Sequence, residues 1–320
     1  MTEKELRVSQ PYRFKGLREM MVEEKTIDGF RVKVASIGDM LIGVACDIGP
    51  RILYLANVKK SELNLFGVLP DIGVETCEGF WRIYGGHRLW SAPEAKPRSY
   101  SLDDQPVDIE IDSDSLKVRG KPEEKNSIQK EIIVKENPEG GVQVIHRIIN
   151  IGRWPIKLAC WALSVMRRNG FAVIPIKSMK VDAEGLLPDR HISIWPYTDM
   201  SDKRLVLTSE YIFVKQDPKA SGPFKIGVNA NPNWAAYWVE GMLFLKQFHY
   251  YGGAEYPDFG CSVEVYTNPN MLELETLGPL KTVDPSSMVE HVEVWRVFNV
   301  GKIKMKPEDV RDKIEPLIRV

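Results

Sequence analysis

Apolar and polar residues alternate at every second position along most of the chain, which is typical of half-buried β-strands. Residues 107–111 (VDIEI) alternate in this way, and residues 130–149 predict a hairpin because KEIIVKE and VQVIHRII flank the turn NPEGG. Further strands, separated by Gly, Pro, Asp and Asn, are expected at residues 30–36, 40–46, 52–56, 156–165, 205–207, 211–216, 243–249, 261–267, 271–277 and 288–298.

One segment near the C-terminus has the pattern of a helix. Residues 307–317 (PEDVRDKIEPL) begin with Pro and two acids and place Val310, Ile314 and Leu317 at helical spacing. No repeat or linker divides the chain, and its most polar stretch, residues 110–126, is expected to be an exposed excursion. Many strands without helices between them favour sheets packed face to face. We therefore expect residues 1–320 to form one all-β domain, a large antiparallel β-sandwich with a short C-terminal helix.

The balance of basic and acidic residues limits the classes of partner that we expect for this protein. With 43 basic and 44 acidic residues, the chain lacks the basic excess of a nucleic-acid-binding surface. Residues 1–16 lack the apolar region of a secretory signal, and the longest uncharged apolar run, residues 158–166, is too short to span a membrane. We expect a cytoplasmic protein with no membrane partner.

Four widely spaced cysteines are expected to be reduced core residues: Cys46, Cys77, Cys160 and Cys261.

Residues 84–94 (YGGHRLWSAPE) are the first candidate for chemistry. The Gly-Gly pair permits a turn or a close approach to a ligand, and His87 can act as acid or base near neutral pH. Arg88 offers a planar fork of donors, and Trp90 a flat face for the C–H face of a sugar. A structural turn with a packed Trp90 and an Arg88–Glu94 pair accounts for the segment equally well.

Residues 272–276 (LELET) are the second candidate. On a strand, Glu273 and Glu275 point to the same face. Two such carboxylates suit general base catalysis or the binding of sugar hydroxyls, although a solvent-facing pair is the commoner arrangement for Glu. Aromatic and polar residues are mixed at residues 195–197, 234–238 and 248–256. This mixture is typical of a cleft for a polyhydroxylated ligand, or of ordinary core packing.

The histidine spacing does not indicate a metal site. His146 shares its expected face with apolar residues, as a core histidine does, and neither it nor His191 nor His291 forms an HxH or HExxH pair. Carboxylates could still join distant histidines around an ion. The chain also lacks a GxGxxG segment after a strand, a Walker lysine loop and a GxSxG elbow. We therefore expect neither a metal nor a cofactor, and disfavour nucleotide-dependent and serine-esterase chemistry.

Several segments, in order, resemble an uncharacterised family of the galactose mutarotase-like superfamily. They are GPRILYLA (49–56), NLFG (64–67), YGGHRLWSAPE (84–94), PIKLACWALSVM (155–166), YPDFGCSVEVYTN (256–268), and LELETLGPL with HVEVW (272–295). The resemblance covers residues 30–300 and implies a twisted antiparallel supersandwich with a carbohydrate-binding cleft on one sheet. A sugar or oligosaccharide is therefore the expected partner.

The resemblance also implies roles for individual residues. In mutarotases of this superfamily, a histidine protonates the ring oxygen of the sugar while a glutamate removes the proton of the anomeric hydroxyl. Glu275 is similar in position to that base, and His87 with Arg88 to a segment in which a second histidine orients the sugar. Ser164 stands where the acid histidine is expected, and a serine cannot protonate a ring oxygen. Either another histidine, His87 being the best placed, replaces it, or the reaction is lost.

Three functions remain open, since a shared fold does not by itself establish an activity. The first is an aldose 1-epimerase-like isomerase. The second is a carbohydrate-binding protein without catalysis, which the serine at position 164 favours. The third is a lyase or hydrolase, the least supported because no acid for the leaving group is evident. For the first, the expected catalytic residues are Glu275 and His87, and the expected sugar-binding residues are Arg88, Trp90, Glu273, Trp161, Tyr197 and Trp234.

Overall fold

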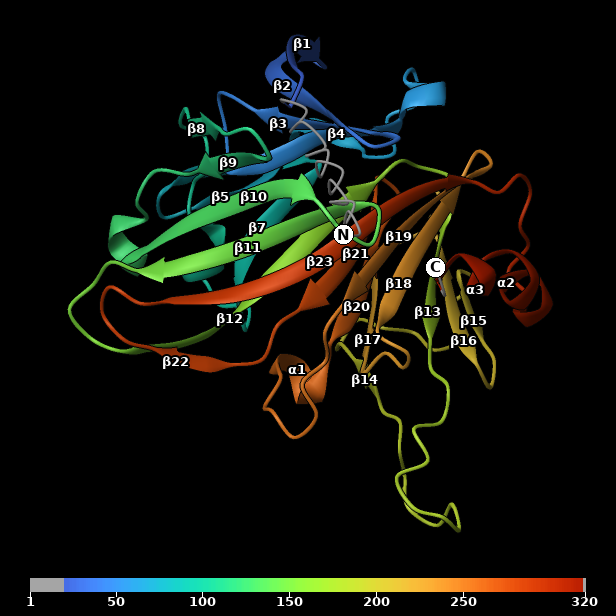
Figure 1. The fold of residues 1–320 in the computed structure, drawn as a ribbon. Helices are drawn as coiled ribbons and strands as arrows, with labels where there is room; N and C mark the ends of the chain where they lie inside the picture. The colour runs from blue at the N-terminus through green and yellow to red at the C-terminus, as the bar shows by residue number, and fades with distance from the viewer. Residues whose placement is uncertain (1–19, 319–320) are drawn as a thin grey trace, which may run out of the picture.

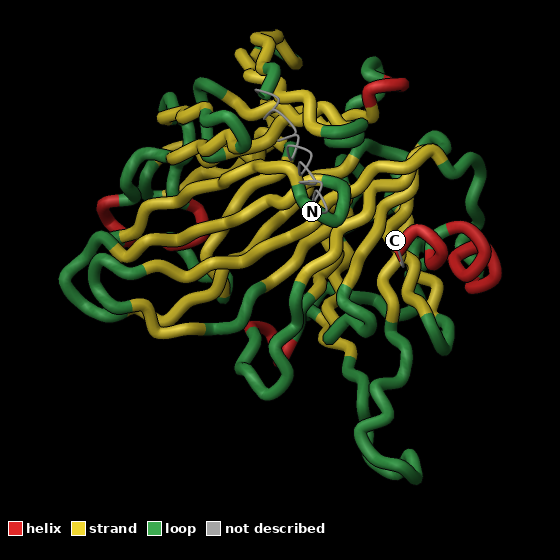
Figure 2. The backbone as a smooth tube through the Cα atoms, in the orientation of Figure 1, coloured by secondary structure: helices red, strands yellow, loops and turns green. Residues whose placement is uncertain are grey.

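Two large antiparallel sheets packed face to face form the body of the molecule (Figure 1). The computed structural model describes residues 20–318, so the polar segment 1–16 lies outside the described residues. Strands dominate and helices are confined to short pieces at the periphery (Figure 2). The expectation of an all-β sandwich with a short C-terminal helix is confirmed.

Within residues 20–318, the first sheet has eleven strands, ten in a continuous order and β22 paired with β12 beside them. From one edge to the other the order is β1 (Val22–Ile27), β2 (Phe30–Ile37), β3 (Met40–Ala45), β4 (Arg51–Asn57), β7 (His87–Ala92), β12 (Ile156–Met166), β21 (Leu272–Leu277), β20 (Val263–Thr267), β17 (Phe224–Val228) and β14 (Ile192–Ile194), with β22 (Lys281–Val283) beside β12.

The second sheet holds ten strands in the same part of the chain, and a separate hairpin completes the β-structure. The order is β15 (Leu205–Leu207), β16 (Tyr211–Lys215), β13 (Phe171–Pro175), β18 (Trp234–Val239), β19 (Met242–Phe248), β23 (Met288–Asn299), β11 (Val142–Asn150), β10 (Ile128–Glu136), β9 (Ser115–Arg119) and β8 (Asp108–Ile111). The hairpin pairs β5 (Val68–Thr76) with β6 (Gly79–Gly85).

The C-terminal helix forms in two pieces, α2 (Pro307–Lys313) and α3 (Glu315–Ile318). Val310 and Ile314 are fully buried in an apolar cluster on the outer face of the second sheet. The remaining helical turns are α1 (Pro257–Gly260), η1 (Val58–Lys60), η2 (Arg98–Tyr100) and η3 (Glu124–Asn126). Across residues 20–318, the helices are all too short or too polar to cross a membrane.

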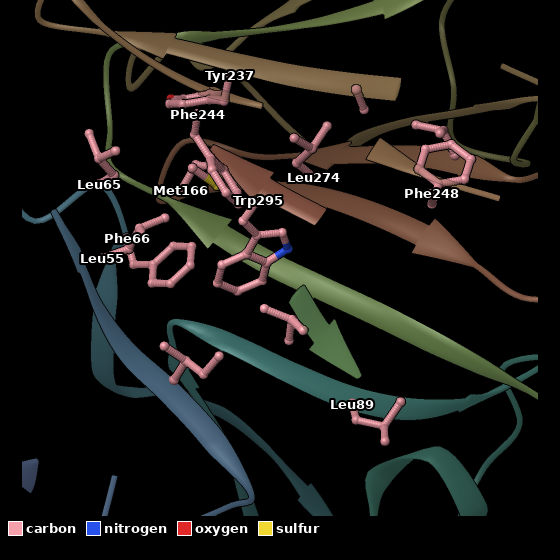
Figure 3. Packing of buried hydrophobic residues seen from close by; sticks show 14 of the residues in the cluster. Leu55, Leu65, Phe66, Leu89, Met166, Tyr237, Phe244, Phe248, Leu274 and Trp295 are labelled. Atoms are coloured by element: carbon pink, nitrogen blue, oxygen red, sulfur yellow. The ribbon is translucent and has the colours of Figure 1, made fainter. Parts of the chain in front are cut away.

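The main core fills the space between the two sheets (Figure 3). Trp295 of β23 stands at its centre, with Phe66 and Phe244 packed edge-on against it at ring-centroid distances of 5.9 and 5.1 Å. Edge-to-face packing of this kind adds to the stabilisation from burial alone. The opposite face of the first sheet carries a second, smaller cluster that includes Trp90 and Trp161.

Residues 110–126 differ from the exposed excursion expected from their polarity. They contain strand β9, whose Leu116 and Val118 are fully buried, and β9 pairs with β10 as a continuation of the second sheet. The alternation of buried Leu116 and Val118 with Lys117 and Arg119 explains the difference, because one face of an antiparallel strand can remain polar even when the other is in the core.

Candidate functional site

A cavity of about 440 Å³ opens on the face of the first sheet that is turned away from the core. Its floor is formed by side chains of five neighbouring strands, and the β5–β6 hairpin forms one wall. The lining residues are Ile72, Gly73, Val74, Trp81, Ile83, Arg88, Trp90, Glu94, Tyr100, Trp161, Leu163, Trp195, Tyr197, Pro223, Lys225, Tyr266, Asn268, Met271, Glu273 and Glu275.

Strand register determines which side chains reach the cavity. Successive residues of a strand point to opposite faces, so Arg88 and Trp90 of β7 line the cavity while His87 and Leu89 face the core.

The glycine pair Gly85-Gly86 directly precedes strand β7. A Cβ on Gly86, whose φ is +65°, would lie 2.3 Å from the carbonyl oxygen of Ile52, so the pair permits a close backbone crossing where β7 begins.

Arg88 and Glu273 form a buried ion pair on the cavity wall. The Arg88 Nη1 donates to Glu273 Oε1 at 2.7 Å, and both side chains are almost completely buried. The guanidinium also lies over the ring of Trp90, 4.6 Å from its centroid, in the geometry of a cation–π contact. A planar, weakly hydrated guanidinium suits this position between a carboxylate and an aromatic face.

Glu275 lies beside this pair and is held by one of its two oxygens. Trp161 Nε1 donates to Glu275 Oε2 at 2.8 Å, and Lys225 Nζ donates to the same oxygen at 3.1 Å. Glu275 Oε1 is buried and has no hydrogen-bond partner among residues 20–318. A carboxylate that lines a cavity, with one oxygen fixed and the other without a partner, has the capacity to accept a hydrogen bond from a ligand.

Lys225 connects Glu275 to a second buried carboxyl, Glu264. The Lys225 Nζ lies 2.7 Å from Glu264 Oε2 and between the rings of Trp161 and Trp195, 4.5 and 4.7 Å from their centroids. Glu264 and Glu275 are direct cross-strand partners on β20 and β21. Like charges in that position repel each other, and the ammonium between them offsets that repulsion.

Burial and the shared ammonium set the electrostatics of these groups. Burial raises the pKa of Glu275 and raises that of Glu264 well above its ordinary value, because water no longer solvates the charged carboxylate; Lys225 counteracts both shifts. For Lys225, burial would lower the pKa, but the two carboxylates outweigh burial and raise the pKa well above the ordinary value. The lysine is therefore a cation at neutral pH.

The absence of a side chain at Gly227 makes room for this arrangement. A Cβ on Gly227 of β17 would lie 2.6 Å from Cys261 Sγ, 3.2 Å from Glu264 Cγ and 3.3 Å from the Trp195 ring. Any larger residue would therefore displace groups that pack around Lys225. Trp195 and Tyr197 follow the edge strand β14 and form the more exposed side of the cavity.

The structure brings six of the eight site residues named from the sequence to this cavity: Arg88, Trp90, Trp161, Tyr197, Glu273 and Glu275. Trp234 does not belong to it. Trp234 starts β18 in the second sheet and is buried in the outer cluster beneath the C-terminal helix. The aromatic density around it reflects core packing, because its ring covers an apolar helix face rather than a cleft.

His87 also lies away from the cavity, on the core side of β7, together with Ser164. The His87 Nδ1 is 2.8 Å from Ser164 Oγ, and its Nε2 is 2.6 Å from Nε2 of His146. His146 Nδ1 must donate to the carbonyl of His291, which only accepts, so His146 Nε2 accepts and His87 Nε2 donates. Burial lowers the pKa of His87 well below its ordinary value, and the chain of neutral groups is complete without a ligand.

Three of the buried groups are close enough together to be considered as metal ligands. One ligand atom each of His87, His146 and Glu293 lies within 4.8 Å of the others, and two histidines with a glutamate form a known zinc set. Here the two imidazoles bond to each other, while Glu293 is bound by Thr276 at 2.5 Å, Trp295 at 2.7 Å and Lys246 at 3.0 Å. The cluster is thus a hydrogen-bonded part of the core.

Sequence reasoning did not identify Lys225 or Glu264. Each interrupts an apolar strand, in FKIGV and VEVYT, and a single charge in an alternating pattern is usually at the solvent face. A weak signal was present in the neighbouring residues, because Gly227 two positions after Lys225 has the same orientation and marks a close approach. Trp195 belongs to an aromatic segment that was noted, but its position over the lysine depends on the fold.

No family model matches the chain, and no curated protein matches its sequence. Its structure is similar to a proposed mutarotase from Salmonella typhimurium, with TM-score 0.55, 9% identity and coverage of 87% of this chain and 94% of that one. It is also similar to a galactose mutarotase-like protein from Clostridium acetobutylicum, with TM-score 0.50, 13% identity and coverage of 88% and 99%.

A third similar structure is a TPR-domain containing protein from Parabacteroides distasonis, with TM-score 0.54 and 12% identity. That match covers 87% of this chain and 50% of the other, so the chain spans half the length of that protein. At these identities the likeness concerns the fold. The chain has the galactose mutarotase-like fold, which confirms at that level the resemblance seen in the sequence.

Proposed function

We propose that this protein binds a sugar in the cavity on the first sheet. The proposal is carried by one observation, the meeting of aromatic faces with fixed charged groups in a cavity of about 440 Å³. Trp195 and Tyr197, which form the more exposed side of the cavity, offer apolar faces for the C–H faces of a sugar ring. The charged groups, which include the Glu275 oxygen without a partner, offer hydrogen bonds to hydroxyls.

Titration calorimetry with a panel of aldoses, ketoses and short oligosaccharides tests this proposal. We expect heat of binding for at least one sugar, and a loss of affinity of about 2- to 12-fold in Trp195→Ala, since a stacked aromatic face contributes ~0.5–1.5 kcal/mol. Trp154→Ala is the matched control, because Trp154 is 78% exposed and does not line the cavity. No binding at millimolar sugar by the wild type, or equal losses in both variants, would contradict the proposal.

A second candidate function, opening and closing of the sugar ring, is favoured by the state of Glu275. The free Oε1 and the raised pKa fit a general base that takes the proton of the anomeric hydroxyl. Among the described residues that line the cavity there is no histidine, so the acid that protonates the ring oxygen must be a different group. Without such an acid, the protein would bind sugars and leave their anomers unchanged.

Polarimetry or proton NMR of a freshly dissolved α-aldose separates binding from catalysis. For an isomerase we expect the wild type to accelerate anomer equilibration and Glu275→Gln to lose about 10²–10⁴-fold of that acceleration. Glu290→Gln, at an exposed ion pair with Arg147, is the control and should keep the wild-type rate. Sugar binding by calorimetry with no acceleration across the panel would favour the carbohydrate-binding protein without catalysis.

A further inference from the structure

Two acidic groups and one basic group lie together with almost no exposed side-chain surface. They are Glu264, Glu275 and Lys225, and we call them the buried trio. The Nζ atom lies 2.7 Å from Glu264 Oε2 and 3.1 Å from Glu275 Oε2. The side chains are between 0% and 5% exposed. Glu275 Oε1 and both oxygens of Glu264 are buried without a hydrogen-bond partner in residues 20–318, although Glu264 Oε2 forms the ion pair with Lys225. With both carboxyls ionised, the trio would hold a net charge of minus one.

The surroundings do not neutralise that charge. The nearest other cation on the cavity wall, Arg88, is already paired with Glu273. The titratable groups that face the trio are Asp258, Cys261, Tyr197, Tyr266, the Arg88–Glu273 pair and Lys246, whose ammonium is already paired with Glu293 at 3.0 Å. Asp258 adds negative charge, and the thiol and phenols add no positive charge. An uncompensated buried charge costs several kcal/mol. One of the two carboxylates of the trio avoids this cost by binding a proton.

We propose that the buried trio holds one transferable proton at neutral pH, and that Lys225 passes it to the ring oxygen of a sugar in the cavity while Glu264 replaces it. The second half of this proposal rests on the proposed function. It assigns the missing acid to a lysine that lines the cavity and a glutamate behind it. Glu264 is a positioning residue, because it acts through Lys225 and does not line the cavity.

The proton movements balance. Glu275 Oε1 takes the proton of the anomeric hydroxyl as the bond between the anomeric carbon and the ring oxygen breaks, which leaves an open-chain aldehyde. The ring oxygen receives a proton from Lys225 Nζ, and protonated Glu264 returns one to Nζ in the same step. Lysine therefore stays a cation, and the net donor is Glu264. Closure on the other face of the carbonyl reverses each transfer, so no oxidant or co-reactant is needed.

Two features support Lys225 as the link. Its ammonium has three N–H bonds; it donates one to Glu275 Oε2 and forms an ion pair with Glu264 Oε2, which leaves at least one N–H bond for a ligand. Burial also raises the pKa of Glu264 well above its ordinary range, with the negative Glu275 and Asp258 adding to the shift and Lys225 opposing it. A glutamic acid that stays protonated near neutral pH has the state that a general acid requires.

Infrared spectroscopy of the sugar-free protein near neutral pH tests the stored proton directly, because a protonated carboxyl has a carbonyl band that a carboxylate lacks. We expect the wild type to show such a band. Glu264→Gln and Glu275→Gln should each abolish it, because one carboxylate then balances one ammonium. Lys225→Met should strengthen it, and the exposed Glu290→Gln should leave it unchanged. Persistence of the band in Glu264→Gln, or its absence from the wild type, would overturn the proposal.

Kinetics test the transfer to the sugar. Glu264→Gln should bind the sugar in calorimetry with an affinity within about threefold of wild type while anomer equilibration slows by about 10²–10⁴-fold. The wild-type rate should fall at high pH as the shared proton is lost, and Glu264→Gln should lack this decline. An unchanged rate in Glu264→Gln overturns the acid role. Absence of sugar binding by the wild type, with the infrared band present, refutes the proposed function and not the stored proton.

Discussion

Replacing Lys225 by Met removes the ammonium of the buried trio and keeps a side chain of similar length. Breaking a buried ion pair by removing one partner costs about 3–5 kcal/mol, and here two carboxyls lose their partner at once. The contacts of the ammonium with the rings of Trp161 and Trp195 are lost too, at ~0.5–2 kcal/mol each. We expect the free energy of unfolding near pH 8 to fall by at least ~3 kcal/mol.

The loss should depend on pH with a definite sign. Without the ammonium, burial leaves the pKa of both Glu264 and Glu275 above the ordinary value of 4.5. Such a carboxyl binds more protons in the folded than in the unfolded protein, so stability is lost as the pH rises from 4.5 through the raised pKa. We therefore expect a smaller loss near pH 5 than near pH 8.

Urea unfolding followed by tryptophan fluorescence measures both quantities. The matched control is Lys157→Met, which breaks an exposed pair with Glu255 at 2.5 Å and should cost less than ~1 kcal/mol at either pH. A loss in Lys225→Met no larger than that of the control would refute the reasoning about the trio. So would a loss that is the same near pH 5 and near pH 8.

Three further substitutions test other parts of the account. Gly227→Ala would place a Cβ 2.6 Å from Cys261 Sγ, so we expect ~1–3 kcal/mol lower stability and weaker sugar binding in calorimetry; full affinity would contradict the packing argument. His87→Ala should cost ~2–5 kcal/mol in urea unfolding and leave sugar affinity within about threefold, whereas a large loss of affinity would return His87 to the site. Arg88→Met and Glu273→Gln should each cost ~3–5 kcal/mol in unfolding, with the double variant more stable than the sum predicts; additive losses would argue against their ion pair.

The strand-rich architecture could be predicted from the sequence because alternation and turn residues are local signals. The hairpin of β10 and β11 and the strand at residues 205–207 formed where the pattern placed them. Strand β7 was not predicted, since HRLWSA is buried on both faces and does not alternate. This omission explains why His87 was expected beside Arg88 in one site, because side chains that are adjacent on one strand point to opposite faces.

The buried trio could not be predicted, because its members come from three strands and meet only through the register in which those strands pair. Lys225 is diagonal to Glu264 through the pairing of β17 with β20, and Glu264 is opposite Glu275 through that of β20 with β21. A shift of one residue in either pairing would turn these side chains to the core face. The register of these strands is determined by all of their buried positions together, and no single sequence motif specifies it.

The most direct test of the central claim is saturation-transfer NMR of a sugar that calorimetry selects, with wild-type protein and Trp195→Ala. If the sugar lies against the aromatic faces of the cavity, its ring C–H protons should receive saturation from the wild-type protein, and the signal should fall strongly in Trp195→Ala. It should remain in Trp154→Ala, whose exposed ring is outside the cavity. Equal signals from all three proteins, or none from the wild type, would contradict the claim that this cavity binds sugar.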